Sequence, residues 1–152
     1  MDIMGADYDD LPKILELQYL AFQSQARLLD NYDIPPLKQT LGEIQAEYEK
    51  YKFLKVVDES GEIIGSIRGY AENGTTYINK VIVHPDCQGR GIGTKLINEL
   101  ENVLPSGRYE LYTSAKSASN IALYVKLGYA PFKELETEPG LSMIYLQKSK
   151  RT

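Results

Sequence analysis

The stretch from Val81 to Leu100, VIVHPDCQGRGIGTKLINEL, contains the residues of this sequence with the clearest chemical meaning. Glycines stand at positions 89, 91 and 93, between an apolar β-branched run and an amphipathic run. This order predicts a strand, a turn and then a helix. Glycine lets a ligand approach the backbone more closely than any side chain would allow, and amides at the start of a helix favour an anion. The stretch is therefore predicted to hold a pyrophosphate group.

Two well-known phosphate-binding motifs do not fit this spacing. A dinucleotide-binding G-x-G-x-x-G motif would need a further glycine after Gly93, but Thr94 stands there. A Walker A loop needs Gly-Lys-Ser/Thr, whereas the order here is Gly93-Thr94-Lys95. A purely structural use of the glycines, for a tight turn and close helix packing, explains less of the flanking sequence.

The composition narrows the class of protein. The chain has 152 residues, 43% apolar and 25% charged, as is typical of a single globular domain, expected to span residues 1–152. The formal net charge of −4 argues against a nucleic-acid partner, and no apolar run reaches the ~18 residues of a membrane span. An acidic start that lacks the features of a signal peptide predicts a cytoplasmic protein. One cysteine and one histidine cannot form an internal disulfide or a metal cluster, so we expect no metal.

Two helices are predicted before the glycine turn and two from it onward. The first covers residues 9–29, and Pro35 and Pro36 separate it from a second at about 38–50. The third runs from about Gly91 to Leu104, and the fourth lies in SASNIALYVKLGY, with Gly128 just after its end. Apolar residues at helical spacing, expected on the buried sides, are Ile14, Leu17, Ala21, Leu28, Leu41, Ile44, Tyr48, Leu96, Ile97, Leu100, Val103 and Leu104.

Strand signals fill the rest of the chain. A hairpin turns at Asp58–Gly61, a second turn at Glu72–Gly74 leads into a strand over 75–83, and RYELYTS forms another strand. The last two strands meet near Pro139-Gly140. The resulting order, β-α-α-β-β-β-α-β-α-β-β, predicts one α/β domain with a mixed sheet and a parallel pair about the glycine turn.

Two segments resemble the Gcn5-related N-acetyltransferases (GNAT family). VIVHPDCQGRGIGTKLI is similar to motif A of that family, Gln/Arg-x-x-Gly-x-Gly/Ala after a strand, through Gln88, Gly91 and Gly93. NIALYVKLGY is similar to its second conserved region, where a tyrosine precedes a Gly-aromatic pair by four residues, as Tyr124 precedes Gly128-Tyr129. The resemblance implies a GNAT-type fold: a mixed, mostly antiparallel sheet of six to seven strands, about four flanking helices and a splayed parallel strand pair.

The resemblance also implies acetyl-CoA as a cosubstrate, bound in the gap between the splayed strands. Backbone groups of Val81, Ile82 and Val83 are then expected to contact the pantetheine arm as an added strand would. Asn120 either contacts the cofactor or caps the start of the helix in which it lies. Ser117 stands at the position where the family often has asparagine. The residues expected to bind the cofactor at the turn are Gln88, Gly89, Arg90, Gly91, Ile92, Gly93 and Thr94. Arg90 and Lys95 either add charge near the phosphates or are solvated.

Acetyl transfer to an amine needs a deprotonated amine, a donor for the oxyanion and a proton for the departing thiolate. Tyr124 matches the family's usual general acid, and a phenol of pKa ~10 is protonated at neutral pH. The alternative interpretation of Tyr124 is that it is an ordinary tyrosine of the core. His84 is predicted to be a turn residue and Cys87 a plain loop residue, because no second histidine exists to activate the thiol.

The general base is not evident. Tyr77 stands where many relatives carry a glutamate, and Asn79, on the same face of an ideal strand, is a poor base. A water chain to Glu72 or Glu110 and an amine that binds already neutral are the remaining options.

The acceptor is not specified by the sequence. In the family it usually lies against the loop between the first two helices and the last strands. In that loop Asp30, Tyr32 and Asp33 would favour a cation or simply form a rigid, solvated turn. Enzymatic transfer to a small-molecule or peptide amine is the main hypothesis. The alternative is a catalytically weak acyl-CoA sensor, suggested by the missing glutamate. Homodimers are common among relatives, and nothing in the sequence specifies one.

Overall fold

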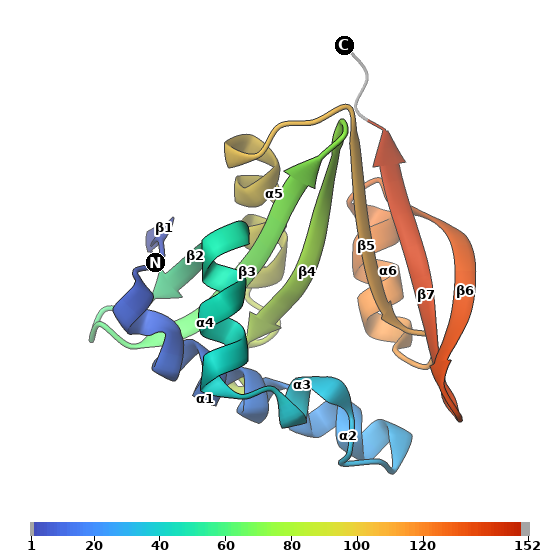
Figure 1. Cartoon of the computed structure of the whole chain (residues 1–152), viewed down its shortest axis with the longest axis horizontal. Coiled ribbons are helices and arrows are strands. Elements are labelled where there is room, and N and C mark those ends of the chain that lie inside the picture. Colours follow the sequence, from blue (N-terminus) through green and yellow to red (C-terminus); the bar gives the residue numbers. More distant parts are fainter. Residues whose placement is uncertain (1, 150–152) are drawn as a thin grey trace.

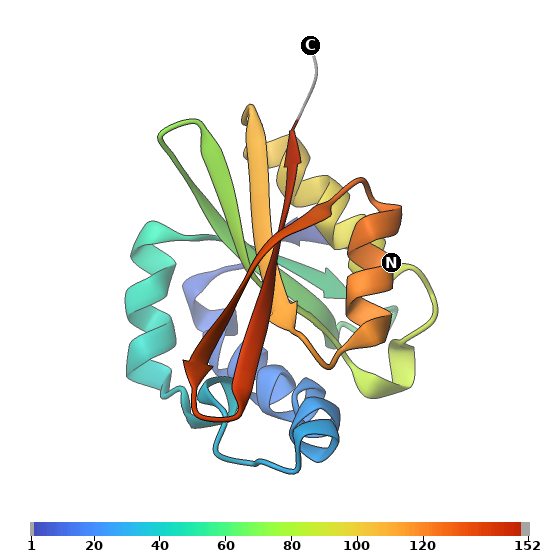
Figure 2. The ribbon, with the colours of Figure 1, turned by 90° about the vertical axis from the view of Figure 1, so that its right-hand side faces the viewer.

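The computed structural model describes residues 2–149 of the chain. One seven-stranded sheet has the order β1-β2-β3-β4-β5-β7-β6, with helices on both of its faces (Figures 1 and 2). The strands are β1 (Asp2–Gly5), β2 (Lys52–Val57), β3 (Ile63–Glu72), β4 (Thr75–Val83), β5 (Arg108–Ser114), β6 (Ala130–Glu138) and β7 (Leu141–Ser149). The helices are α1 (Leu11–Ala21), α2 (Gln23–Leu29), α3 (Pro35–Lys38), α4 (Leu41–Lys50), α5 (Ile92–Val103) and α6 (Ala118–Lys126), with short 3-10 turns at η1 (Tyr8–Asp10) and η2 (Pro85–Cys87).

β4 and β5 form the parallel pair of the sheet, and they separate soon after they meet. Their pairing runs only from Thr75 opposite Arg108 to Tyr77 opposite Glu110. Beyond that point β5 remains paired with β7 along its whole length, while β4 continues beside β3. Figure 1 shows the wedge that opens between β4 and β5. The predicted splayed pair is therefore present.

A β-bulge in β4 lies at the start of this wedge. Arg68 of β3 pairs with Lys80, and the next residue, Gly69, pairs with Ile78. Asn79 is thus an extra residue without a partner in β3. A bulge bends its strand and increases the local twist, which directs β4 away from β5. The same irregularity means that the simple alternation of faces expected for Tyr77 and Asn79 does not apply.

Apolar side chains on the two faces of the sheet hold the helices in place. The face under α5 and α6 buries one cluster, and the face under α1 and α4 buries another. Each fully buried Leu or Ile contributes about 1.5–3 kcal/mol relative to an exposed one. Members of the first cluster include Ile67, Ile78, Leu96, Leu100, Tyr109 and Leu146, and members of the second include Leu11, Ile14, Ile44, Phe53 and Ile82.

The strands agree closely with the sequence-based expectation, and the fold class is confirmed. The described residues contain six α-helices where about four were expected, because the predicted first helix divides at Phe22 and a short helix forms at α3. The predicted helix from Lys38 instead begins at Leu41, since the Thr40 hydroxyl accepts a hydrogen bond from the amide of Glu43 and caps the helix there.

Three apolar residues expected in the core are exposed. Leu28 is 54% exposed, Val103 41% and Leu41 38%. Leu41 and Val103 are the first and last residues of their helices. Leu28 lies after the division at Phe22 and contributes to the wall of a cavity. The prediction of burial at these three positions is wrong.

Gly69→Ala is expected to destabilise the fold by about 2 kcal/mol, the usual cost of overpacking. A Cβ at this position would lie 2.5 Å from the carbonyl oxygen of Tyr77 and 2.9 Å from a methyl group of Leu100, so backbone must move at the bulge. Urea denaturation measures the change. Gly42→Ala is the matched control, because its Cβ would meet nothing within 4 Å and alanine favours the helix by up to about 1 kcal/mol. Equal midpoints for the two variants would contradict this packing argument.

Candidate active site

The glycine turn leaves a set of backbone amides free to bind a ligand. Gly89 and Gly91 have φ angles of 79° and 77°, a left-handed conformation that favours glycine, and a Cβ at either would meet only open space. Within the described residues, no backbone carbonyl accepts a hydrogen bond from the amides of residues 88–94. These amides surround the start of the twelve-residue helix α5, which favours negative charge. The turn therefore fits a pyrophosphate.

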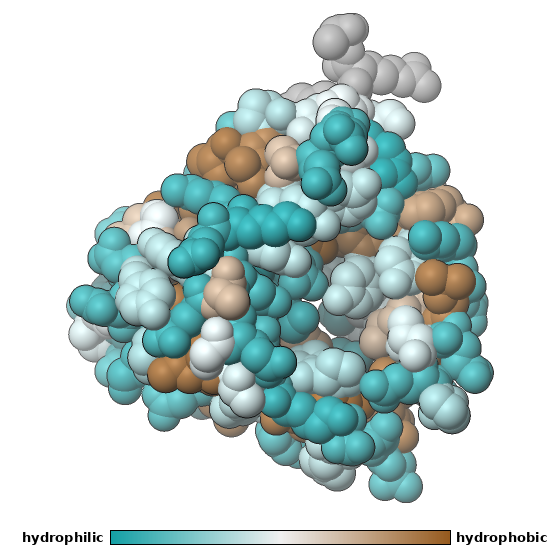
Figure 3. Space-filling view, viewed as in Figure 1, coloured by the Kyte–Doolittle hydropathy of each residue, from teal (hydrophilic) through white to brown (hydrophobic). Residues whose placement is uncertain are grey.

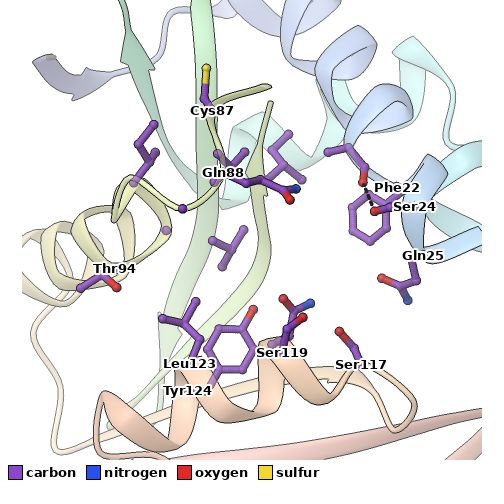
Figure 4. Close-up of a pocket in the computed structure, with 18 of the residues that line it drawn as sticks. Phe22, Ser24, Gln25, Cys87, Gln88, Thr94, Ser117, Ser119, Leu123 and Tyr124 are labelled. Carbon is purple, nitrogen blue, oxygen red and sulfur yellow. Dashed lines mark hydrogen bonds between the residues drawn. The ribbon is translucent and has the colours of Figure 1, made fainter. Parts of the chain in front are cut away.

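A cavity of about 630 Å³ lies beside this turn. Three parts of the chain form its walls: the glycine turn with the end of β4, the α1–α2 junction, and α6 (Figure 4). Ser24 and Gln25 face Ser119 and Tyr124 across the space in Figure 4. The full lining is Ala21, Phe22, Ser24, Gln25, Leu28, Val81, Ile82, Val83, Cys87, Gln88, Gly89, Gly91, Ile92, Gly93, Thr94, Ser117, Ser119, Asn120, Leu123 and Tyr124.

Most residues predicted to bind the cofactor are brought together here. The exception is Arg90, whose side chain is exposed and outside the lining. Asn120 lines the cavity and donates to the Thr113 hydroxyl at 3.3 Å, so it ties α6 to β5. Ser117 is the N-cap residue of α6 without a side-chain cap bond, and it too lines the cavity. That these residues bind the cofactor remains a prediction.

A second cavity, of about 270 Å³, occupies the wedge between β4 and β5. It shares Val81, Asn120 and Tyr124 with the first cavity, so the two join beside Tyr124. A third cavity, of about 550 Å³, shares Lys80 and Tyr112 with the second. The three cavities therefore adjoin one another in series, from the glycine turn, through the wedge, to the α3–α4 side, and we call this series the passage. Figure 3 shows this face hollowed at its centre.

Tyr124 stands where the first two cavities meet. It is 6% exposed, and Figure 4 shows its hydroxyl pointing from α6 toward the strands. Burial raises the pKa of Tyr124 to about 12, so the phenol keeps its proton across the ordinary working range. A protonated hydroxyl in this place can donate to a departing thiolate.

The carboxylates suggested as remote bases lie elsewhere. Glu72 is exposed at the β3–β4 turn, and Glu110 is paired with Arg108 at 2.8 Å, both at the end of the sheet where β4 and β5 are still joined. Neither lines any of the three cavities. Tyr77 stacks on Tyr70. The sequence-based candidates therefore do not supply a base in the passage.

The acidic residues of the loop proposed as an acceptor site lie outside the passage, although Pro35 and Pro36 of the same loop line the second and third cavities. Asp30, Tyr32 and Asp33 line none of the three cavities, and Asp33 pairs with Lys38 at 3.4 Å on the surface. The third cavity instead takes its walls from α3, α4 and the sheet. Its ionisable and aromatic lining residues are Lys38, Glu43, Glu47, Tyr51, Lys80, Tyr112 and Glu138.

A buried arginine connects the elements around the third cavity to the sheet. Arg68 of β3 is 1% exposed, and its Nη2 donates to the side-chain oxygens of Gln18 at 3.0 Å and Gln39 at 2.8 Å. Its Nε lies 2.9 Å from Oε1 of Glu47, an ion pair whose N–H does not point at the oxygen. Gln18 also donates to the carbonyl of Pro36. One guanidinium thereby fixes α1, α4 and the α3 segment relative to β3.

His84 and Cys87 lie next to and in the short 3-10 turn after β4, and Cys87 also lines the first cavity. The Nδ1 atom of His84 accepts a hydrogen bond from the amide of Asp86 within the turn after β4. Cys87 is a free, partly buried thiol. In residues 2–149 no group of three or more His, Cys, Asp or Glu is placed to hold a metal ion. The described helices include none that is long and apolar enough to cross a membrane.

Several residues of the passage could not be found by sequence reasoning. Phe22 stands at a helix break that has no motif, and Ser24 and Gln25 follow it in α2. Lys80 and Tyr112 are single residues in strands. The only sequence signal for Lys80 and Tyr112 is that they lie in strands already expected to flank the wedge. The α1–α2 residues reach the site through tertiary packing alone.

The comparisons with known proteins agree with this geometry. Residues 11–129 match the model described as Acetyltransferase (GNAT) family. UPF0157 protein YqkA of Bacillus subtilis (strain 168) is 24% identical over 130 residues, which are 85% of this chain and 37% of YqkA, so this chain spans little more than a third of that relative. A protein of Pyropia yezoensis called "Uncharacterized N-acetyltransferase ycf52" is 23% identical over 120 residues, 71% of this chain and 69% of that protein.

A solved structure has the same architecture. The crystal structure of PaiA N-acetyltransferase from Thermoplasma acidophilum, in complex with coenzyme A, superposes with a TM-score of 0.79 at 16% identity and covers 99% of this chain and 100% of that one. At this identity the likeness concerns the fold. The family match covers well over half of the sequence, and it includes the glycine turn and Tyr124. The chain belongs to the GNAT family of acetyltransferases.

Proposed function

We propose that the protein is an acetyl-CoA-dependent N-acetyltransferase that acts on a primary amine by direct attack on the thioester. The observation that supports this most is the series of adjoining cavities, with the free amides of the glycine turn at one end and a cleft lined by three glutamates at the other. The wedge between them, with Tyr124 in its wall, is the place where donor and acceptor can meet.

The coenzyme is proposed to lie along the first cavity. The amides of residues 88–94 bind its pyrophosphate, and the edge of β4 at Val81–Val83, which has left β5, offers backbone groups to its amide-bearing arm. Asn120, held by Thr113, contacts the arm from α6. This arrangement directs the thioester into the wedge.

Tyr124 is proposed to donate a proton to the thiolate as it departs. The departing thiolate, whose thiol has a pKa of ~8.5, can accept a hydrogen bond or a proton from the phenol. Since burial raises the pKa of Tyr124 to about 12, deprotonation of this acid would limit activity only at very alkaline pH.

The acceptor is proposed to be cationic in solution. Three carboxylates, Glu43, Glu47 and Glu138, line the third cavity, where Tyr51 adds an aromatic face. Carboxylates and aromatic rings both attract an ammonium group. Both a small polyamine-like molecule and the terminus of a peptide satisfy this chemistry.

The decisive experiment is to incubate the purified protein with acetyl-CoA and a panel of amines and to measure free thiol. The proposed enzyme releases thiol at a rate that depends on one class of amine, and mass spectrometry then finds the acetylated amine. Tight binding of CoA without thiol release on any amine would instead identify the alternative, an acyl-CoA sensor. If the protein neither bound CoA nor released thiol, both the enzyme hypothesis and the sensor hypothesis would be overturned.

Gly91→Ala tests the pyrophosphate site. The Cβ would meet no protein atom, so the fold is kept at a strain cost of about 1–2 kcal/mol, but the methyl group would stand where the phosphates approach the amides. We expect the affinity for CoA, measured by calorimetry, to fall about tenfold. This fall corresponds to the loss of roughly one charge-assisted hydrogen bond.

Gly61→Ala is the matched control for this variant. Gly61 has a φ of 86° and equally open space, and it lies in the β2–β3 turn outside the three cavities. It should lose similar stability and keep its CoA affinity. Equal CoA affinities in the two variants would show that the turn does not hold the pyrophosphate.

A further inference from the structure

Lys80 lies where the wedge opens into the acceptor cleft. It lines both the second and the third cavity, and it directly precedes Val81 at the junction with the first cavity. Because Lys80 pairs with Arg68 across β3 and β4, its side chain shares the α1–α4 face of the sheet with that residue. The bulge at Asn79 produces this register. Lys80 therefore adjoins the path that an incoming amine must take to the thioester.

The surroundings of Lys80 favour its neutral form. Burial, and then the positive charge of Arg68, lower the pKa of Lys80 to about 8, and Glu47 opposes them only in part. Glu47 is already paired with Arg68 at 2.9 Å, and within residues 2–149 no carboxylate oxygen lies within 4.0 Å of the Lys80 ammonium. The charged or titratable groups that face this region are Arg68 from β3, Lys38 from α3, Glu43, Glu47 and Tyr51 from α4, Tyr112 from β5 and Glu138 from β6.

The lining of the wedge contains few groups that can accept a proton. Its ionisable residues are Lys80 and three tyrosines, Tyr112, Tyr124 and Tyr145, and its described lining includes no carboxylate and no histidine. Burial raises the pKa of Tyr112 and Tyr124, so these phenols donate protons at neutral pH rather than accept them. Lys80 is the remaining candidate at this place.

We infer that Lys80 is the general base of the proposed transfer, taking a proton from the acceptor ammonium at the mouth of the wedge. This inference rests on the proposed acetyltransferase function and supplies the base that neither Tyr77 nor the remote glutamates provide.

The protons balance in this scheme. The acceptor ammonium transfers one proton to Nζ of Lys80, and the resulting amine forms a C–N bond to the thioester carbonyl carbon as the C–S bond breaks. The thiolate takes a proton from the hydroxyl of Tyr124, which regains one from the attacking nitrogen. Lys80 then releases its proton to solvent through the open cleft. The products are the amide, free CoA thiol and one proton.

The first test is the pH profile of kcat/KM for an amine that the wild type acetylates. In the wild type, kcat/KM should rise through about pH 8 as Lys80 becomes neutral and then stay level through the pKa of the acceptor, about 10 for a primary amine. In Lys80→Met the reaction should be about 10²-fold slower at pH 8, and its rate should rise until the acceptor itself is neutral. Because methionine removes a poorly solvated charge, this variant should fold.

Two further variants separate proton transfer from charge and structure. Lys80→Arg keeps the positive charge and the length but cannot give up a proton near neutral pH, so it should be as slow as Lys80→Met. Lys126→Met removes an exposed lysine at the end of α6 and should leave the profile unchanged. Wild-type activity in Lys80→Arg would show that Lys80 acts through its charge and would overturn the inference.

The second test needs no acceptor. Trace acetylation of the wild type with acetic anhydride at a series of pH values, read by mass spectrometry, reports the neutral fraction of each lysine. Lys80 should be labelled with a midpoint near pH 8, well below that of the exposed lysines. A midpoint equal to theirs, or an unchanged pH profile in Lys80→Met, would overturn the inference and leave the proposed function intact. If no amine caused thiol release at any pH, both the inference and the proposed function would be overturned.

Discussion

Tyr124→Phe is expected to lower kcat about 10²-fold, the usual contribution of a positioned general acid, and to leave the dissociation constant of CoA unchanged. The substitution removes one hydroxyl from a side chain that is 6% exposed and keeps the ring that packs in the α5–α6 cluster. The thiolate would then leave without a proton donor at the junction of the first two cavities. Steady-state kinetics and calorimetry with CoA measure the two quantities separately.

The control for this variant is Tyr32→Phe. Tyr32 is 55% exposed and lies outside the three cavities, so its loss should change neither kcat nor CoA binding. A Tyr124→Phe enzyme with wild-type kcat would remove Tyr124 as the acid. A variant that loses CoA affinity instead would show that the hydroxyl serves binding rather than proton transfer.

The strands were predictable because each is bounded by local signals. Alternation of apolar residues, the turn at Asp58–Gly61 and Pro85 after β4 act within a few residues of the strands that they end. The division of the first helix at Phe22 has no such signal. The sequence there has good helix formers, and the break follows from how α1 packs on the sheet and α2 on the α3 segment, which are distant in sequence.

The candidate site divides in the same way. Its coenzyme half depends on a glycine turn and a helix start that are continuous in sequence, so Gln88, Gly91 and Gly93 identify it directly. Its acceptor half is assembled from α3, α4, β5 and β6, and the sequence pointed to Asp30 and Asp33 instead. No local pattern reports that a bulge places Lys80 beside Arg68, because the bulge is a property of the β3–β4 pairing.

The net charge is consistent with this division of roles. An acidic protein is not expected to bind an anionic coenzyme through long-range attraction, so the proposed coenzyme site depends on short-range backbone donors at the glycine turn. The same acidic balance favours the approach of a cationic acceptor. In this proposal the backbone amides of the glycine turn bind the coenzyme, and the electric field of the whole protein attracts the acceptor.

Arg68→Met should destabilise the protein by about 3 kcal/mol, the low end of the range for breaking a buried ion pair. The variant leaves Glu47 without its partner and removes the donor to Gln18 and Gln39. The carboxylate of Glu47 is 23% exposed and can be partly hydrated, which limits the loss. Urea denaturation at pH 7 measures the change in the free energy of unfolding.

The double variant Arg68→Met/Glu47→Gln separates the unpaired charge from the lost packing. Because glutamine carries no charge to leave unpaired, we expect the double variant to be more stable than Arg68→Met alone. The acceptor KM should rise in both variants, since α1 and the α3 segment lose their shared anchor, while CoA affinity should change less. If Arg68→Met lost under about 1 kcal/mol, or if the double variant were no more stable, the Arg68–Glu47 pair would not be what fixes the acceptor side to the sheet.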